Sequence, residues 1–237
     1  MNRKWDDLPA LFPALPDPGR WLPLIVRHLE LLEAASDRAR STSVRPKDAI
    51  RRNYAESLEI LRVAEEAEGG EFPSLVDVGS GGGYPGLVIA AVRPACEVHL
   101  VEPLQKRARL LQEMAAELGL SNVHVYPLRA EEAGRGPLRD AFPFVTARAV
   151  APLRELLEYT APFAADGALL AFPKGSALDE ELLAAPAAMA AFGVEAVGVV
   201  PMRPEISELL RVALFRKHGA TDARYPRRPG MPRMRPL

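Results

Sequence analysis

The first third of the chain carries apolar residues at helical spacing. Leucine and isoleucine recur every three or four positions within residues 21–39, with charged residues between them, which predicts a helix there. A second helical pattern covers about residues 47–68 and ends at two glycines. Residues 1–20 are rich in proline, and we expect them to be irregular. Because no strand pattern occurs in this part, we predict a small helical lobe over residues 1–70.

After this lobe, short apolar runs alternate with helical stretches. The predicted strands cover residues 75–78, 97–101, 122–126, 144–147 and 168–172, and the predicted helices cover 87–92, 104–118, 152–163 and 178–192. Two late runs, at 194–200 and 209–215, predict a closing antiparallel hairpin. Alternation of this kind is typical of a parallel sheet with helices on both faces, so we predict an α/β, Rossmann-like domain over residues 71–218. The Pro- and Arg-rich residues 219–237 are expected to form an extended basic tail.

Composition agrees with a packed globular protein. Of 237 residues, 48% are hydrophobic and 26% are charged, which argues against disorder. The single cysteine, Cys96, cannot form an internal disulfide. The first ten residues are charged where a secretory signal would be apolar, and the apolar run beside the glycine-rich stretch is too short to cross a bilayer. We therefore expect a cytoplasmic protein without membrane contact, and a monomer by default.

Charge is unevenly distributed, although the net charge is only −1. Residues 216–237 hold seven basic residues against one acidic residue, and residues 38–52 hold six against one. Most of these residues are arginines, which suit bidentate phosphate contacts and also suit an ordinary solvated surface. Charge alone does not separate the two interpretations.

The glycine-rich stretch LVDVGSGGGYPG, residues 75–86, follows the first predicted strand. A dinucleotide fingerprint fits it as Gly81-x-Gly83-x-x-Gly86. In that register, however, the first glycine comes three residues after Val78, too late for the tight turn. Pro85 also lacks the backbone N–H that a pyrophosphate would use at a helix start. A P-loop is excluded because no Gly-Lys-Ser or Gly-Lys-Thr follows.

A second register, Asp77-x-Gly79-x-Gly81-x-Gly83, places a carboxylate before alternating glycines. A carboxylate would repel a diphosphate but suits a donor-rich loop and a cationic ligand. S-adenosylmethionine, with its sulfonium, is the predicted ligand. Glu102, at the end of the second predicted strand, is placed to accept hydrogen bonds from ribose hydroxyls, a geometry that serves NAD and S-adenosylmethionine alike.

Several motifs carry a resemblance to a known family. They are DVGSGGGYPG at 77–86, VRP at 92–94, RAEE at 129–132, ARAVAPL at 147–153, PKG at 173–175 and YPRRPGMPRMRPL at 225–237. With them the chain resembles the class I methyltransferases and, more narrowly, the ribosomal small subunit methyltransferase G family. The resemblance implies the class I methyltransferase fold. It also implies methyl transfer from S-adenosylmethionine to N7 of a guanine in 16S rRNA of the small ribosomal subunit.

The resemblance also implies roles for individual residues. The glycine loop, with Gly79 and Tyr84, would line the cofactor, and Glu102 would hold its ribose. Ala130 and Glu131 would lie along the adenine.

On the substrate side, Arg148 would sit where the methyl donor meets the base, and Lys174 would contact phosphate. Arg227 and Arg228 are the predicted RNA contacts of the basic tail. Residues 41–43 and 53–57 depart from the family pattern, which has Asn-Leu-Thr and a His-Phe-Leu-Asp-Ser type sequence there. These departures concern the choice of RNA and leave cofactor binding untouched.

The chemistry implied needs no general base, because N7 of guanine offers a lone pair and carries no proton at neutral pH. Positioning should therefore dominate, with Arg148 orienting the guanine. No cysteine follows the fourth strand to attack a pyrimidine, and no metal-ligand cluster is evident in the histidine spacing. Three alternatives remain: a methyltransferase with another RNA target, a non-catalytic protein that binds RNA and S-adenosylmethionine or a nucleotide, and, most distantly, a dehydrogenase.

Overall fold

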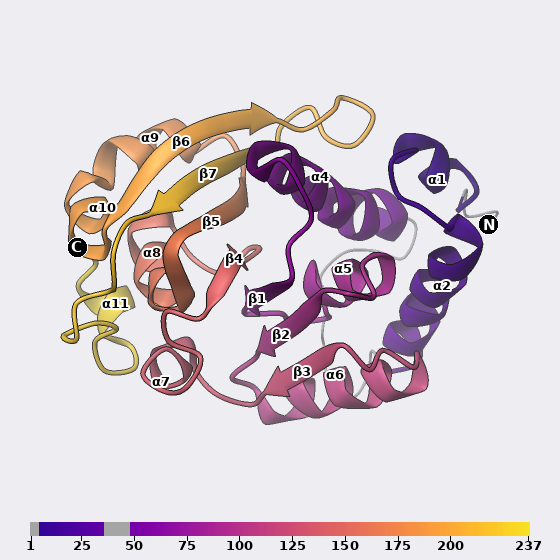
Figure 1. The fold of residues 1–237 in the computed structure, drawn as a ribbon, viewed down its shortest axis with the longest axis horizontal. Coiled ribbons are helices and arrows are strands. Elements are labelled where there is room, and N and C mark those ends of the chain that lie inside the picture. The colour runs from indigo at the N-terminus through magenta and orange to yellow at the C-terminus, as the bar shows by residue number, and fades with distance from the viewer. Residues whose placement is uncertain (1–4, 36–47) are drawn as a thin grey trace.

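The computed structural model describes residues 5–35 and 48–237, and they form an α/β fold around one seven-stranded sheet (Figure 1). The strand order is β3-β2-β1-β4-β5-β7-β6. The strands are β1 (Ser74–Val78), β2 (Glu97–Val101), β3 (Val123–Tyr126), β4 (Phe142–Thr146), β5 (Ala164–Lys174), β6 (Val194–Pro201) and β7 (Arg211–Lys217). Strands β1 to β5 pair in parallel, whereas β7 runs antiparallel to both β5 and β6. The predicted α/β sheet with a closing antiparallel hairpin is confirmed.

Helices cover both faces of the sheet (Figure 1). They are α1 (Asp7–Leu11), α2 (Pro18–Ala34), α4 (Glu56–Glu68), α5 (Gly86–Val92), α6 (Gln105–Glu117), α7 (Ala130–Ala133), α8 (Leu153–Thr160), α9 (Leu178–Ala184), α10 (Pro186–Phe192) and α11 (Met231–Met234). The π-helix η2 (Ile50–Ala55) leads directly into α4, and the 3₁₀ turn η3 (Ala161–Phe163) leads into β5. Helices α2, α4, α5 and α6 share one hydrophobic core with the sheet, and helices α8 to α10 share a second. Of the N-terminal helices, α4 thus packs on the sheet at β5 and β7, whereas α2 packs on α5.

The order of the strands determines where a ligand can enter. Along the chain, β1, β2 and β3 follow one another outward on one side of the sheet, and β4 and β5 follow one another outward on the other side. The order of the strands therefore reverses between the parallel neighbours β1 and β4. Asp77 of β1 is level with Thr146 of β4, and the loops that follow these two strands leave the same edge of the sheet. In open α/β sheets this topological switch point is where the crevice for a ligand forms. The glycine-rich loop after β1 lies at this edge.

Proline explains two differences from the predicted elements, the start of α2 and the break between α9 and α10. The lead-in that was expected to be irregular contains α1, and α2 begins at Pro18, whose missing N–H costs nothing at the first position of a helix. The single helix predicted over residues 178–192 is wrong, because Pro186 cannot continue α9 and instead starts α10. Residues 36–39, the end of the first predicted helix, lie outside the described residues.

The C-terminal tail is folded against the domain rather than simply extended, which corrects the prediction. It contains α11, and the Tyr225 ring packs edge-on against Phe192 of α10, with ring centroids 4.9 Å apart. Arg227 forms an ion pair with Glu158 of α8, a carboxylate that is only 1% exposed. These contacts are made by residues far apart in sequence, and composition alone did not reveal them.

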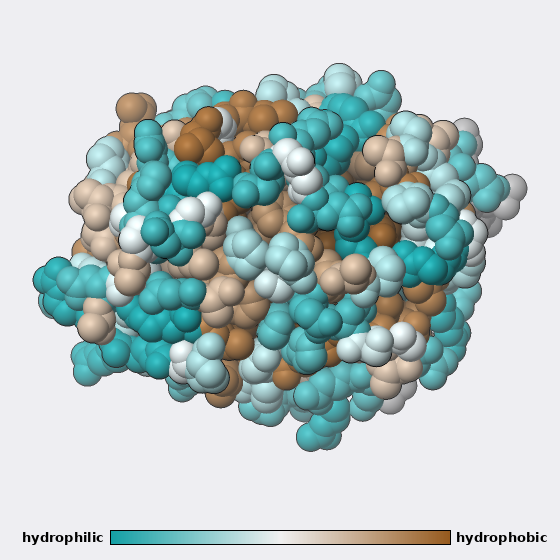
Figure 2. All heavy atoms as spheres, in the orientation of Figure 1, coloured by the Kyte–Doolittle hydropathy of each residue, from teal (hydrophilic) through white to brown (hydrophobic). Residues whose placement is uncertain are grey.

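The visible surface mixes polar and apolar atoms. Figure 2 shows hydrophilic side chains surrounding separate apolar patches on this face. No helix among the described residues is long and apolar enough to cross a membrane.

Candidate functional site

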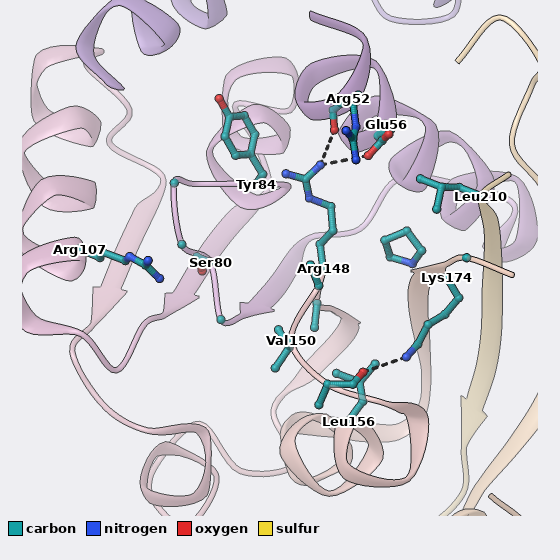
Figure 3. A pocket seen from close by; sticks show the side chains of 18 of the residues that line it. Arg52, Glu56, Ser80, Tyr84, Arg107, Arg148, Val150, Leu156, Lys174 and Leu210 are labelled. Carbon is teal, nitrogen blue, oxygen red and sulfur yellow. Dashed lines mark hydrogen bonds and ion pairs between the residues drawn. The ribbon is translucent and has the colours of Figure 1, made fainter. Parts of the chain in front are cut away.

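A cavity of about 900 Å³ opens at the edge of the sheet where β1 and β4 end (Figure 3). Its walls come from residues 79–82 of the glycine loop, residues 147–151 after β4 and residues 173–175 at the end of β5. Arg52 and Glu56 close it from the N-terminal helices. A volume of this size suits a nucleoside-sized ligand with part of a second group beside it.

Gly79 begins the loop at a position where only a residue without a side chain fits. Its φ is +78°, and a Cβ there would lie 2.7 Å from Cγ2 of Val150 across the cavity wall. The backbone N–H of Gly79 donates to the carbonyl of Val101 in β2, which fixes the loop against the sheet. The loop therefore presents backbone, rather than side chains, to the cavity.

Asp77 lies beneath the glycine loop and does not line the cavity. Its Oδ2 accepts the backbone N–H of Gly86 at 3.0 Å, at the start of α5. Its Oδ1 is buried without a hydrogen-bond partner among the described residues. Burial raises the pKa of Asp77 to about 7, so near neutral pH the carboxyl is only partly charged. Within the structure, Asp77 supports a donor-rich loop, one of the two effects expected of it.

Glu102, just after β2, also acts on the loop. Its Oε2 accepts the N–H of Gly81 at 2.9 Å, and its Oε1 accepts the N–H of Leu104 at 3.0 Å. The side chain is buried and lies behind the cavity wall. A carboxylate has about four acceptor positions, so these two bonds leave capacity for further donors.

Arg148, directly after β4, joins the cavity to the N-terminal helices (Figure 3). Its Nη1 donates to the carbonyl of Arg52 at 2.6 Å and lies 3.2 Å from Oε2 of Glu56, and its Nη2 donates to Oδ1 of Asn53 at 3.0 Å. Its guanidinium carbon is 5.2 Å from the centroid of the Tyr84 ring. Burial lowers the pKa of Arg148, opposed by the charge of Glu56. A cation on the cavity wall is thus fixed by contacts that the sequence did not reveal.

A chain of hydrogen bonds links helix α2 to the glycine loop. His28, only 2% exposed, lies with Nε2 2.9 Å from the carbonyl oxygen of Gly82 and Nδ1 2.9 Å from the hydroxyl of Tyr54. Because a carbonyl only accepts, the proton is assigned to Nε2, and Nδ1 accepts from Tyr54. The Tyr54 hydroxyl in turn accepts from that of Tyr84 at 3.1 Å. Burial lowers the pKa of His28 to about 4, which keeps the ring neutral.

The sequence interpretation missed this chain. The spacing of the histidines, His28 among them, indicated no site, and Tyr54 lies within residues 53–57, where the chain departs from the family pattern. The π-helix η2 carries Tyr54 and Asn53 to the site, and such irregular turns often occur at functional positions. No pattern in the sequence predicts that turn.

The remaining predicted site residues have varied surroundings. Lys174 lines the cavity, where its Nζ donates to the carbonyl of Ala151 at 2.9 Å and pairs with Glu181 at 2.6 Å. Ala130 and Glu131 form the start of α7, which was not predicted, and neither lines the cavity. The Glu131 carboxylate accepts the N–H of Gly230 at 2.9 Å, so the tail contacts the segment expected beside the adenine.

Gly83 likewise lies outside the lining, whereas Gly81 and Tyr84 belong to it. In the tail, Arg227 is committed to Glu158, and Arg228 is exposed. Within residues 5–35 and 48–237, no three His, Cys, Asp or Glu side chains come together in a way that could hold a metal ion.

Comparison with known proteins identifies the family to which this site belongs. A family model described as rRNA small subunit methyltransferase G matches residues 22–209. The ribosomal RNA small subunit methyltransferase G of Roseiflexus castenholzii is 38% identical over 221 residues, covering 92% of each chain. That of Symbiobacterium thermophilum is 35% identical over 222 residues, covering 90% of this chain and 89% of its own. This chain belongs to the rRNA small subunit methyltransferase G family.

Solved structures show the same fold at low identity. A SAM-dependent methyltransferase from Aquifex aeolicus has a TM-score of 0.52 at 18% identity, covering 73% of this chain and 93% of its own. A 16S rRNA adenine-N1 methyltransferase from Catenulisporales acidiphilia has a TM-score of 0.51 at 18% identity, covering 72% of this chain and 93% of its own. The predicted family, the class I methyltransferase fold and the activity of a methyltransferase G that uses S-adenosylmethionine on small-subunit rRNA are confirmed.

Proposed function

We propose that this protein methylates N7 of a guanine in 16S rRNA within the cavity between β1 and β4. The observation that carries the proposal is the shape of that cavity. The glycine loop faces it from one side, and Arg148, Lys174 and Glu56 face it from the other (Figure 3). A methyl donor and a base therefore have adjoining places at the switch point of the sheet.

The side of the cavity formed by the glycine loop fits an adenosyl ligand. The loop offers backbone at Gly79, where a Cβ would collide with Val150, so a ligand can approach closely. In the proposal, Gly79, Gly81 and Tyr84 line the ligand from the front. Asp77 and Gly83 act from behind or beside the loop. In the proposal Glu102 holds the ribose, and Ala130 and Glu131 lie along the adenine.

The substrate half supplies position rather than proton transfer. Bound S-adenosylmethionine supplies a methyl group on a sulfonium, and the N7 lone pair takes it as the methyl–sulfur bond breaks. No proton has to leave N7, so the contribution of the protein is alignment. Toward the described residues Arg148 uses three of its five N–H groups, and in the proposal the other two serve the acceptor edge of the base or the adjacent phosphate. Lys174 and the tail residues Arg227 and Arg228 are the proposed phosphate contacts.

The parts of the chain divide the work in the same way. In the proposal, residues 1–70 close the substrate side, residues 71–218 bind the cofactor, and residues 219–237 extend the RNA-binding surface. In the proposal the protein acts as a monomer. The site of action proposed is the cytoplasm.

The experiment measures cofactor binding and methyl transfer separately. Calorimetry with S-adenosylmethionine, S-adenosylhomocysteine and NAD should give heat with the first two alone. Single-turnover methylation of 16S rRNA should then fall at least 10-fold in Arg148→Ala, while its cofactor affinity changes less than about 3-fold. Equal methylation by the variant and the unaltered protein would remove Arg148 from the site, and uptake of NAD alone would overturn the proposal.

A further inference from the structure

Charge on the cavity wall is of one sign with a single exception. Among the described residues that line the cavity, four are cationic: Arg52, Arg107, Arg148 and Lys174. The one carboxylate in that set is Glu56, the first residue of α4. A cationic wall suits an RNA phosphate, so the carboxylate needs a separate explanation.

Glu56 has an acceptor that no described residue uses, on a side chain that is mostly buried. Its side chain is 10% exposed, and its Oε2 lies 3.2 Å from Nη1 of Arg148. Among the described residues, its Oε1 has no hydrogen-bond partner. The ion pair with Arg148 fixes the carboxylate, since the arginine is held independently by Arg52 and Asn53. Oε1 is therefore held at the cavity wall without a hydrogen bond from a described residue.

The position of Glu56 relative to the loop gives this oxygen a direction. Figure 3 shows Glu56 on the side of Arg148 away from Ser80 and Tyr84 of the glycine loop. A guanine whose N7 faces the methyl donor at the loop keeps its Watson–Crick edge, which lies at about a right angle to N7, clear of the donor. That edge carries N1–H and the N2 amino group, two adjacent donors. Adenine instead presents the N1 lone pair there, which a carboxylate would repel.

We propose that Glu56 selects guanine by accepting hydrogen bonds from N1–H and the N2 amino group of the target base. This inference rests on the proposed function, since it requires a guanine in the cavity. Glu56 reads the edge that does not react, while Arg148 holds the carboxylate in place. In this recognition Oε1 accepts one of the two donors, and Oε2 accepts the other with the lone pair that Arg148 leaves free. Two such bonds to one base strengthen binding and reject other bases.

The test pairs a protein change with a base change. RNA substrates carry guanine, inosine or 2-aminopurine at the target position: inosine lacks the N2 amino group, 2-aminopurine lacks N1–H, and both keep N7. The unaltered protein should methylate each analogue with kcat/KM about 10-fold or more below that for guanine, since one bond to a charged acceptor is lost. Glu56→Gln should lower kcat/KM for guanine about 10- to 100-fold and bring guanine and inosine within about 3-fold of each other.

A purely structural role for Glu56 predicts a different result. If Glu56 only fixed Arg148, Glu56→Gln would lower kcat/KM by the same factor for all three substrates, and that outcome would overturn the inference. Glu56→Asp keeps a carboxylate and should retain the preference for guanine over inosine. Glu180→Gln, at an exposed position of α9, is the matched control and should leave all three rates unchanged.

Two further outcomes separate this inference from the proposed function. Equal rates on guanine and inosine by the unaltered protein would refute the role of Glu56 while leaving guanine methylation intact. Cofactor binding without any methylation of guanine RNA would refute both. Calorimetry of each variant with S-adenosylhomocysteine identifies a variant that has not folded, and Glu56→Asp then carries the test.

Discussion

Lowering the pH should weaken the hydrogen-bonded link between helix α2 and the glycine loop, and the group that takes up the proton is His28. His28 donates from Nε2 to the carbonyl of Gly82 and accepts at Nδ1 from Tyr54. Only the neutral ring can do both. A second proton on Nδ1 would face the Tyr54 hydroxyl, in a position where the ring is 2% exposed. This is why burial lowers the pKa of His28 to about 4.

The size of the effect follows from that pKa. In the unfolded chain His28 titrates near its ordinary value of about 6.5. Between pH 6.5 and 4 the unfolded chain binds the proton more readily than the folded protein does. The stability associated with neutral His28 is therefore fully present above pH 6.5 and is lost as the pH falls towards 4. The loss is about 2 kcal/mol at pH 5 and about 3 kcal/mol at pH 4.

Urea denaturation at pH 7.5 and pH 5.0 measures this loss. Because His99 has its pKa lowered to about 4 as well, the unaltered protein must be compared with His28→Gln, which keeps a donor and an acceptor but does not titrate. The variant should lose about 2 kcal/mol less on acidification. His218→Gln, at an exposed position after β7, should behave as the unaltered protein does. The same acid loss with and without His28 would refute the reasoning.

Further predictions concern the loop and the tail. Gly86→Ala places a methyl group against Leu100, so its free energy of unfolding should fall by about 1–3 kcal/mol, measured in urea; an unchanged value would mean that the backbone moves freely there. Arg227→Ala leaves Glu158 buried without its partner and should cost about 3 kcal/mol by the same assay, and a loss below about 0.5 kcal/mol would show that the tail is not anchored there. Arg228→Ala should leave stability unchanged but lower the salt dependence of RNA binding by about one phosphate contact, and an unchanged slope would remove it from the RNA-binding surface.

The elements of the sheet could be predicted because their signals are local. Apolar runs such as residues 97–101 and the stripe along 104–118 are bounded by turn residues, and β2 and α6 agree with them within one residue at each end. Where the prediction was wrong, a single residue outweighed the periodicity, as Pro186 did between α9 and α10. The four-residue helix α7 is too short to produce a period at all.

The site could be predicted only in part, for a different reason. The glycine loop and Glu102 follow strands directly, so their place at the sheet edge is fixed by local order and topology. The partners of Arg148 and Arg227 are 92 and 69 positions away in sequence, at Glu56 and Glu158. Such pairs exist only after the helices have packed. A pattern in the chain reveals the residue type but not the partner.

The central claim is that the cavity brings a guanine N7 to the methyl group of S-adenosylmethionine. Its most direct test is to incubate the protein with methyl-labelled S-adenosylmethionine and 16S rRNA, as naked RNA and as small subunits. The labelled nucleotide is then mapped by chain cleavage specific for N7-methylguanine. The account predicts label at N7 of one guanine in at least one of the two substrates. Label on another atom or another base, with the cofactor bound, would contradict it.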